Sequence, residues 1–329
     1  MSALTTETQR PRVLVARAVF PDIVTQLARV AEVEATPDDA IQTPERLRER
    51  LRDKHGAFIT NSERIDAQLL EACPLLRVVS TMTVGVDHID LAACAARGVI
   101  VTHAPDVLTE TTADFGFALL LAAARQMSEA ERYLREGRWN KWRYDLFAGA
   151  DVHGAVLGIV GMGRIGRAIA RRAACGFDMR VLYHNRSRLD AGVEQACRAE
   201  YRSLDDLLRQ SQHVLLALPY SPAAYHLIGA RELALMRPGA TLVNVARGGV
   251  IDEVALAAAL HSGRLGAAGL DVFEGEPTVN PALLAAPRVV LTPHIASASV
   301  PTRRAMVQLA VDNLAAVLRG QPPLTPVRV

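Results

Sequence analysis

Three short motifs in the second half of the chain each carry a polar side chain just after an apolar run. Arg247 lies in NVARGGVID, Glu276 in GLDVFEGEP and His294 in LTPHIAS. Arginine can grip a carboxylate with two parallel hydrogen bonds, histidine can hand a proton to a carbonyl oxygen, and a neighbouring glutamate can orient the imidazole and favour its protonated form. Together these groups suit hydride transfer to a 2-keto acid. Taken singly, each also has a structural interpretation: a helix cap for Arg247, a turn acid before Pro277 for Glu276, and a polar strand end for His294.

A glycine-rich turn supplies the cofactor part of the prediction. The apolar run AVLGIV leads into a GxGxxG sequence, which opens the helical pattern RIGRAIARRAA; the residues are Gly161, Met162, Gly163, Arg164, Ile165 and Gly166. In this context the first glycine allows a tight turn, the second lets the backbone approach a pyrophosphate, and the third lets helix and strand pack closely. The helix N-terminus adds N–H donors and a partial positive charge. The pattern predicts a dinucleotide site, with a glycine turn that holds no ligand as the structural alternative.

The end of the next apolar run, VLYHNRSR, indicates which dinucleotide is preferred. An acid at this point would accept hydrogen bonds from the ribose 2′-hydroxyl of NAD, but Asn185, Arg186, Ser187 and Arg188 include none. A 2′-phosphate carries roughly two negative charges, which arginine matches with charge-assisted, forked hydrogen bonds. The stretch therefore predicts that NADP(H) is preferred and that NAD(H) is the second choice. A solvated basic loop is the alternative.

The elements that must position these residues alternate between short apolar runs and helical patterns. Strands are expected at 12–16, 56–60, 77–81 and 99–103, and a second series begins at 155 and continues to VVLTP at 289–293. One long helix is expected over about 111–136, and an amphipathic helix over 301–320 closes the chain. This rhythm predicts an α/β fold with two Rossmann-like, doubly wound parallel-sheet domains and a ligand cleft between them.

Composition restricts the function classes. The 329 residues carry a net charge of +2 with acids and bases mixed, whereas a nucleic-acid partner usually needs a concentrated basic face. The longest apolar run is about half a membrane span, and the polar first residues do not resemble a signal peptide. The four cysteines have no CxxC spacing, and no metal motif occurs. A cytoplasmic protein without bound metal, nucleic acid or membrane is therefore expected, and its four cysteines are expected to be buried or inert.

The motifs, in this order and spacing, resemble the D-isomer-specific 2-hydroxyacid dehydrogenase family over essentially the whole chain after the first dozen residues. The similar stretches include TMTVGVDHID, VLTETTADFGFALLLAAAR, VGMGRIGRAIARR and LPYSPAAYHLIG. Within the family the chain looks most like the bacterial glyoxylate/hydroxypyruvate reductases that also reduce 2-ketogluconate, above all in GRWNKWRYD. The resemblance implies an NAD(P)-dependent reductase of small 2-keto acids with Arg247, Glu276 and His294 in the roles given above.

The resemblance also implies an arrangement of domains and further binding residues. It implies a substrate domain of residues 1–105 and 298–329, and a dinucleotide-binding domain of residues 106–297. It makes the backbone of Val84 and Gly85 a partner of the substrate carboxylate and Asp271 the acceptor for the nicotinamide amide. The residues expected along the cofactor's path are Leu218, Pro219, Val245 and Ala246.

The family pattern also predicts a homodimer, with Trp142 near the partner's substrate pocket; packing of Trp139 and Trp142 within their own subunit is the alternative. The chain departs from the pattern at Thr112, Val86 and Ala296, which leaves the size of the substrate open. Two other functions stay open. A 3-phosphoglycerate dehydrogenase would need further basic residues near the substrate phosphate, and a dinucleotide-sensing co-repressor usually carries long extra tails.

Overall fold

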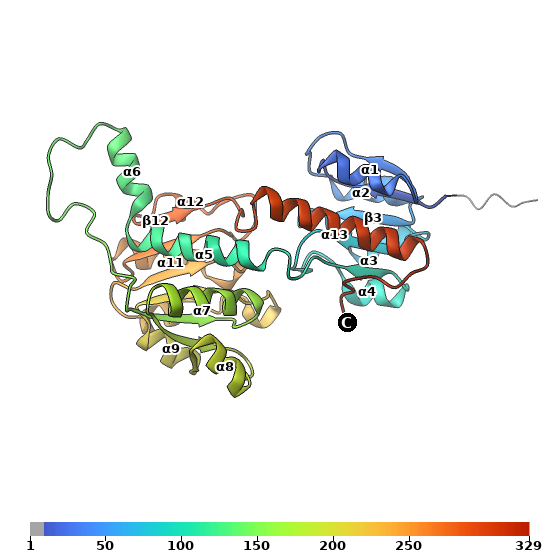
Figure 1. Cartoon of the computed structure of the whole chain (residues 1–329). Coiled ribbons are helices and arrows are strands. Elements are labelled where there is room, and N and C mark those ends of the chain that lie inside the picture. Colours follow the sequence, from blue (N-terminus) through green and yellow to red (C-terminus); the bar gives the residue numbers. More distant parts are fainter. Residues whose placement is uncertain (1–9, 329) are drawn as a thin grey trace, which may run out of the picture. The chain divides into compact units, whose positions relative to one another are not determined.

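The computed structural model describes residues 10–328 of the chain (Figure 1). The polar first residues of the chain lie almost wholly outside the described part. The described chain forms two compact units, one made of the part up to Leu108 together with the part from Ser299 onward, and the other of Thr109–Ala298. Each unit has its own parallel sheet, so the predicted fold class of two parallel-sheet α/β domains is confirmed.

The first unit contains a five-stranded parallel sheet in the order β2-β1-β3-β4-β5. Its strands are β1 (Arg12–Val15), β2 (Glu32–Ala35), β3 (Gly56–Ile59), β4 (Val78–Thr81) and β5 (Ile100–Thr102). Its helices are α1 (Pro21–Leu27), α2 (Pro44–Leu51), α3 (Ala67–Ala72), α4 (Leu91–Ala96) and the closing helix α13 (Val300–Leu318). Although α13 comes from the far end of the sequence, it packs on β3, β4 and α1, so both ends of the chain contribute to one core (Figure 1).

The second unit contains a seven-stranded parallel sheet in the order β12-β11-β10-β9-β6-β7-β8. Its strands are β6 (Val156–Val160), β7 (Arg180–His184), β8 (Ala199–Tyr201), β9 (His213–Leu216), β10 (Thr241–Asn244), β11 (Ala267–Leu270) and β12 (Val289–Leu291). The chain winds outward from β6 to β8 and then returns to the other side of β6 at β9. The carboxyl ends of β6 and β9 therefore form a topological switch point, which is where open α/β sheets bind ligands.

Helices cover both faces of this sheet. Helices α5 (Thr109–Ala124) and α7 (Arg164–Gly176) share a buried core on one face. Helices α9 (Leu204–Gln210), α10 (Ala230–Leu235) and α11 (Glu253–His261) share a second core on the other face. The remaining elements are α6 (Met127–Arg135), α8 (Ala191–Cys197), α12 (Pro281–Leu284) and the 3₁₀ turns η1 (Pro222–Ala224) and η2 (Gly248–Val250). Burial on both faces explains why the central strands are mostly apolar rather than alternating between apolar and polar residues.

The single helix expected over 111–136 was wrong, because the structure has two helices there. Gln126 adopts the left-handed conformation with φ of 52° and separates α5 from α6. The first helix is buried, whereas α6 has no buried residue, and α6 and the loop after it extend away from the sheet (Figure 1). A change of backbone direction at one residue leaves the apolar pattern on both sides almost unchanged, so periodicity alone did not reveal it.

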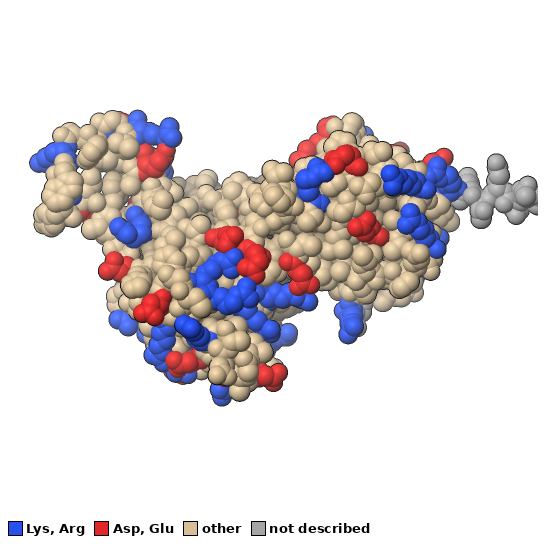
Figure 2. Space-filling model, viewed as in Figure 1, with Lys and Arg blue, Asp and Glu red and all other residues tan. Residues whose placement is uncertain are grey.

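The surface and the helices agree with the composition. On the face drawn in Figure 2, lysine and arginine are interspersed with aspartate and glutamate rather than gathered in one field. Within residues 10–328, no helix is long and apolar enough to cross a membrane. The four cysteines are all unpaired; Cys73, Cys94 and Cys197 are buried, whereas Cys175 is exposed.

Candidate active site

The glycine-rich turn between β6 and α7 is shaped by two close contacts. Gly161 has φ of +98°, and a Cβ there would lie 2.6 Å from the backbone nitrogen of Leu218. A Cβ at Gly166 would lie 2.3 Å from the carbonyl oxygen of Gly161. Real Cβ atoms do not approach other atoms so closely, so both positions require glycine. The turn is thereby pressed against the chain that leaves β9.

The middle glycine has a different environment. Apart from its neighbours in the chain, no described residue has a heavy atom within 4 Å of the position that a Cβ at Gly163 would occupy. Gly163 is the N-cap of α7, so it offers no side chain to the first N–H groups of that helix. The open space therefore faces a helix end that carries N–H donors and a partial positive charge, which is the arrangement that binds a pyrophosphate. This geometry fits a dinucleotide.

The loop after β7 is tied to the glycine turn and to a nearby acid. The side-chain oxygen of Asn185 accepts a 2.7 Å hydrogen bond from the backbone N–H of Met162. The sequence position of Arg188 suggested a side chain that is available to a cofactor. In the structure its guanidinium instead makes two hydrogen bonds of 2.9 and 2.8 Å with Glu194. The hydrogen bonds from Arg188 and Tyr183 lower the pKa of Glu194 to about 2, so this acid remains charged. Arg186 is exposed and becomes the arginine to consider for a 2′-phosphate.

The histidine and glutamate of the predicted catalytic set lie together. Nδ1 of His294 lies 2.7 Å from Oε2 of Glu276, and Oε1 of Glu276 accepts a 2.9 Å hydrogen bond from the backbone N–H of Phe273. Burial raises the pKa of Glu276, but the hydrogen bond and charge of His294 outweigh this effect and leave the pKa below its ordinary value. The carboxylate is therefore charged at neutral pH and engages Nδ1, which leaves Nε2 as the ring atom that can transfer a proton.

The turn that presents His294 is held by a buried carboxylate. His294 has φ of 52°, an uncommon conformation for a residue other than glycine, and its N–H donates to the carbonyl oxygen of Asp271 at 2.8 Å. The Asp271 carboxylate is fully buried and accepts hydrogen bonds of 2.8 Å from the backbone of Ile295 and Ala296 and from the Thr292 hydroxyl. Burial raises the pKa of Asp271. These contacts give Asp271 a role in shaping the histidine turn, and its contact with the nicotinamide amide stays a prediction.

Arg247 follows β10, and its segment is shaped by Asn244, a residue that was not among the predicted site residues. The buried side chain of Asn244 donates to the carbonyl oxygen of Arg247 at 2.8 Å and accepts from the N–H of Ala246 at 2.9 Å. A buried asparagine at the end of an apolar strand was the available signal. The positive charge of Arg247 also helps to lower the pKa of Glu276, so the structure brings the predicted arginine, glutamate and histidine into one neighbourhood. Val245 and Ala246 lie in the same segment, and Leu218 and Pro219 follow β9.

The loop predicted to bind the substrate carboxylate follows β4 in the first unit. The hydroxyl of Thr83 donates to the carbonyl oxygen of Gly85 at 2.7 Å. Nδ1 of His103 lies 3.0 Å from the carbonyl oxygen of Val84. The hydroxyls of Thr81 and Thr83 lie 2.8 Å apart. These bonds engage side chains and carbonyl oxygens, so they define the loop without using the N–H groups of Val84 and Gly85.

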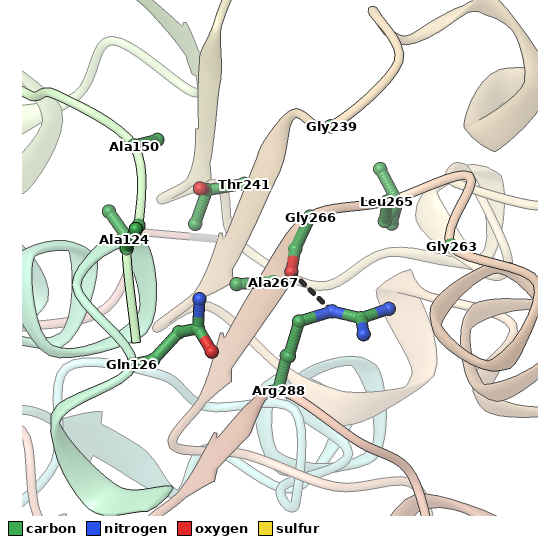
Figure 3. Close-up of a pocket in the computed structure, with 12 residues that line it drawn as sticks. Ala124, Gln126, Ala150, Gly239, Thr241, Gly263, Leu265, Gly266, Ala267 and Arg288 are labelled. Carbon is green, nitrogen blue, oxygen red and sulfur yellow. Dashed lines mark hydrogen bonds between the residues drawn. The ribbon is translucent and has the colours of Figure 1, made fainter. Parts of the chain in front are cut away.

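A hollow of about 480 Å³ lies in the second unit, at the amino ends of strands of the seven-stranded sheet (Figure 3). Its walls include Thr241 and Ala267, the first residues of β10 and β11, whereas the predicted catalytic residues follow the carboxyl ends of the strands. The guanidinium of Arg288 donates to the carbonyl oxygens of Gly266 and Leu260 at 2.8 and 2.7 Å, so it joins the sheet edge to the end of α11. This hollow is separate from the candidate active site. Among residues 10–328, no cluster of three or more histidine, cysteine or acidic side chains could hold a metal ion.

The chain is similar to known proteins in both sequence and fold. Residues 117–296 match the model of the D-isomer specific 2-hydroxyacid dehydrogenase, NAD binding domain. The chain is 44% identical over 320 residues to the glyoxylate reductase of Thermococcus gammatolerans, covering 96% of this chain and 95% of the relative. A solved Thermus thermophilus protein is 42% identical, with a TM-score of 0.89 over 96% of this chain and 100% of that one. The NADPH-dependent glyoxylate/hydroxypyruvate reductase of Sinorhizobium meliloti, solved with NADP and malonate, is 37% identical, with a TM-score of 0.82 over 97% of each chain.

Proposed function

Because the chain belongs to the D-isomer specific 2-hydroxyacid dehydrogenase family and is an NAD(P)-dependent oxidoreductase, we propose that it reduces small 2-keto acids to D-2-hydroxy acids with NADPH. Glyoxylate and hydroxypyruvate are the proposed substrates, since they appear in the names of the relatives. The larger 2-ketogluconate is proposed on the sequence resemblance alone.

The observation that carries this proposal is the 2.7 Å contact between Nδ1 of His294 and Oε2 of Glu276 beside the charge of Arg247. In the proposed mechanism Arg247 binds the substrate carboxylate with its forked guanidinium. His294 donates a proton from Nε2 to the carbonyl oxygen, which prevents a full negative charge from building up there. Glu276 orients the ring through Nδ1 and stabilises the imidazolium before the proton leaves.

The cofactor is assigned to the open space in front of α7. When bound, the reduced nicotinamide supplies the hydride. The backbone of Gly163, Arg164 and Ile165 is proposed to hold the pyrophosphate, since the Gly163 position is open and the helix end carries N–H donors. Met162, whose N–H donates to Asn185, is proposed to line the cofactor site beside them. Further residues proposed to line the cofactor's path are Asn185, Ser187, Leu218, Pro219, Val245, Ala246 and Asp271.

The preference for NADPH is proposed on the exposed side chain of Arg186, on the lack of an acid in the segment 185–188, and on the relative whose title names NADPH and NADP. Residues 106–297 are proposed as the dinucleotide-binding domain, and residues 1–105 with 298–329 as the substrate domain. In the latter, the N–H groups of Val84 and Gly85 are proposed donors to the substrate carboxylate.

The test is a set of kcat/KM values for glyoxylate, hydroxypyruvate and 2-ketogluconate, each with NADPH and with NADH. His294→Asn is the control, because it should retain the fold while losing the proton donor. We expect NADPH oxidation with at least one acid, and a loss of about 10²- to 10⁴-fold in kcat for the control. An enzyme that oxidises NADPH with none of the three, or a fully active His294→Asn variant, would contradict the proposal.

We further propose that the protein is a homodimer in which α6 and the loop after it meet a second copy. Apolar side chains there are unusually exposed, with 78% of Trp142, 86% of Tyr144 and 57% of both Met127 and Leu134 accessible. Such a surface is typical of a protein interface rather than of a free monomer. Light scattering at micromolar concentration should give twice the mass of the chain. If Trp142 also reaches the partner's substrate pocket, Trp142→Ala should raise the substrate KM while the dimer persists.

A further inference from the structure

The loop that carries Glu276 is held from outside the predicted catalytic set. Glu274, two residues earlier, accepts a 2.9 Å hydrogen bond from the hydroxyl of Tyr225, and its other oxygen lies 3.0 Å from Nε2 of His226. The hydrogen bond from His226 lowers the pKa of Glu274, so this carboxylate is charged. Its side chain is thus bonded to the segment that follows η1.

A second acid holds the backbone of the same loop. Glu253, the first residue of α11, is only 5% exposed, and its Oε1 accepts a 2.7 Å hydrogen bond from the backbone N–H of Glu274. Burial raises the pKa of Glu253, and the nearby charges of Glu274 and Glu276 act in the same direction. Burying an acid close to other acids is unfavourable unless a hydrogen bond compensates for the loss of water. For Glu253 that hydrogen bond is the one from the backbone of the loop.

The two segments that supply these contacts are joined to each other by backbone hydrogen bonds. The N–H of His226 donates to Gly249 at 2.8 Å, that of Ile228 to Val250 at 3.1 Å, and that of Asp252 to Ile228 at 3.0 Å. The segments 225–228 and 249–253 together are called the frame below; Tyr225 and His226 lie in the first segment, and Glu253 lies in the second. Both segments bond to Glu274, one through its side chain and the other through its backbone.

The frame also touches the arginine segment. A Cβ at Gly248, the residue after Arg247, would lie 1.8 Å from the carbonyl carbon of Phe273. The N–H of Phe273 donates to Glu276. Displacement of the loop at Phe273 or Glu274 would therefore move the Glu276 carboxylate relative to both Arg247 and His294.

We propose that Glu253 and Glu274 are positioning residues, which hold the loop Phe273–Glu276 so that the Glu276 carboxylate stays bonded to Nδ1 of His294. The effect on turnover rests on the proposed function of Glu276, whereas the effect on the bond itself does not. Neither residue touches the reacting atoms in this assignment. Tyr225 and His226 act through Glu274.

The experiment reads the state of the His294 ring directly. Proteins labelled with ¹⁵N-histidine are compared at alkaline pH, where the neutral ring carries its proton on one nitrogen and the ¹⁵N shifts report which; His294→Asn assigns the signal. In the parent, the bond to Glu276 should keep the proton on Nδ1. Glu276→Ala defines the ring without that bond. In Glu253→Ala the ¹⁵N shifts of His294 should move toward those of Glu276→Ala. In Glu253→Gln they should stay near the parental values, because the amide oxygen can still accept the hydrogen bond from Glu274. The double variant Glu253→Ala with Glu276→Ala should give the same shifts as Glu276→Ala alone.

Turnover is measured on the same variants with glyoxylate and NADPH. A displacement of the loop by a fraction of an ångström to an ångström should lower kcat about 10- to 100-fold with little change in the substrate KM. If the ring moves in Glu253→Ala but kcat stays at the parental value, the positioning holds and the proposed role of Glu276 fails. If the ring keeps the parental state, the positioning proposal is overturned whatever the kinetics show. Should Glu253→Ala not fold, Tyr225→Phe decides instead, because this half-exposed side chain loses only its bond to Glu274; a smaller shift in the same direction supports the proposal, and an unchanged ring refutes it.

Discussion

Selection of NADPH should depend on Arg186 far more than on Arg188, although both arginines occupy the same short loop. Arg188 makes two hydrogen bonds with Glu194, and Glu194 also accepts a 2.6 Å hydrogen bond from Tyr183. To reach a phosphate, Arg188 would have to leave an acid whose pKa is about 2. Arg186 is exposed at the end of β7 and meets no such obstacle in reaching a 2′-phosphate.

The expected size of the effect follows from the number of charged hydrogen bonds lost. One hydrogen bond to a charged group contributes about 1.5–3 kcal/mol, which corresponds to a change of roughly 10- to 150-fold in kcat/KM for NADPH. Arg186→Ala should therefore lower kcat/KM for NADPH by this factor and leave that for NADH nearly unchanged. Arg188→Ala should change the ratio of the two cofactors much less. It should instead lower the melting temperature, since Glu194 would lose one partner and keep only Tyr183.

The assay is the ratio of kcat/KM for NADPH and NADH at saturating glyoxylate, measured for the parent and both variants, with melting temperatures recorded beside it. The matched pair separates a phosphate contact from a general change in the charge of the loop, because each variant removes one positive charge. Equal losses in the two variants would mean that charge alone matters. A larger loss in Arg188→Ala would show that this arginine leaves Glu194 when the cofactor binds, and the reasoning from its hydrogen bonds would be wrong.

Three further predictions concern the proposed catalytic and cofactor residues. The pKa of Glu276 is below its ordinary value of 4.5, so the stability that its charge provides should be present above that pH and be lost as the pH falls below it. The difference in unfolding free energy between the parent and Glu276→Gln, measured by chemical denaturation, should therefore shrink in acid. Gly163→Ala should fold normally and weaken NADPH binding measured by calorimetry, whereas Gly166→Ala, whose Cβ would lie 2.3 Å from a carbonyl oxygen, should lower the melting temperature. Arg247→Lys should raise the keto-acid KM and lower kcat together, since an ammonium group cannot reproduce a forked grip, and unchanged steady-state constants would argue against Arg247 as the carboxylate ligand.

Sequence pattern was sufficient for the buried part of the fold. The central strands of both sheets are buried on both faces. Each of them therefore appears in the sequence as a short, mostly apolar run without the spacing of an amphipathic helix. The GxGxxG turn could also be predicted, because each glycine has a separate physical reason. A Cβ at Gly161 or Gly166 would clash with backbone atoms, whereas the position at Gly163 is open for a ligand. Local sequence and tertiary environment agree at these positions.

Two of the four edge strands, β2 and β8, escaped the pattern. Their sequences, EVEA and AEY, are short and carry glutamate, so they lack the apolar runs that mark the centre of a sheet. Their place is set by the neighbouring strand, through pairing of β1 with β2 and of β7 with β8. A strand that exists because its neighbour offers hydrogen bonds has little signature of its own.

The candidate site shows the same division between what is local and what is distant. Arg247, Glu276 and His294 could be found because each follows an apolar strand within a recognisable motif. Their support could not, since the bond from Glu253 to the loop spans 21 residues of sequence and that from Tyr225 to Glu274 spans 49.

These distant contacts converge on a loop in which Phe273 is buried in the core, whereas Glu274, Gly275 and Glu276 are exposed. The position of the exposed residues depends on a few polar contacts, and each contact contributes a large share of their ordering. The acid that orients the histidine sits on such a loop, and the histidine itself sits on a turn held by the buried carboxylate of Asp271. The geometry of the pair therefore depends on two acids, Asp271 and Glu253, that bond to backbone rather than to substrate. Substitutions at these two positions should alter the pairing of Glu276 and His294 even though the proposed catalytic set would be chemically complete.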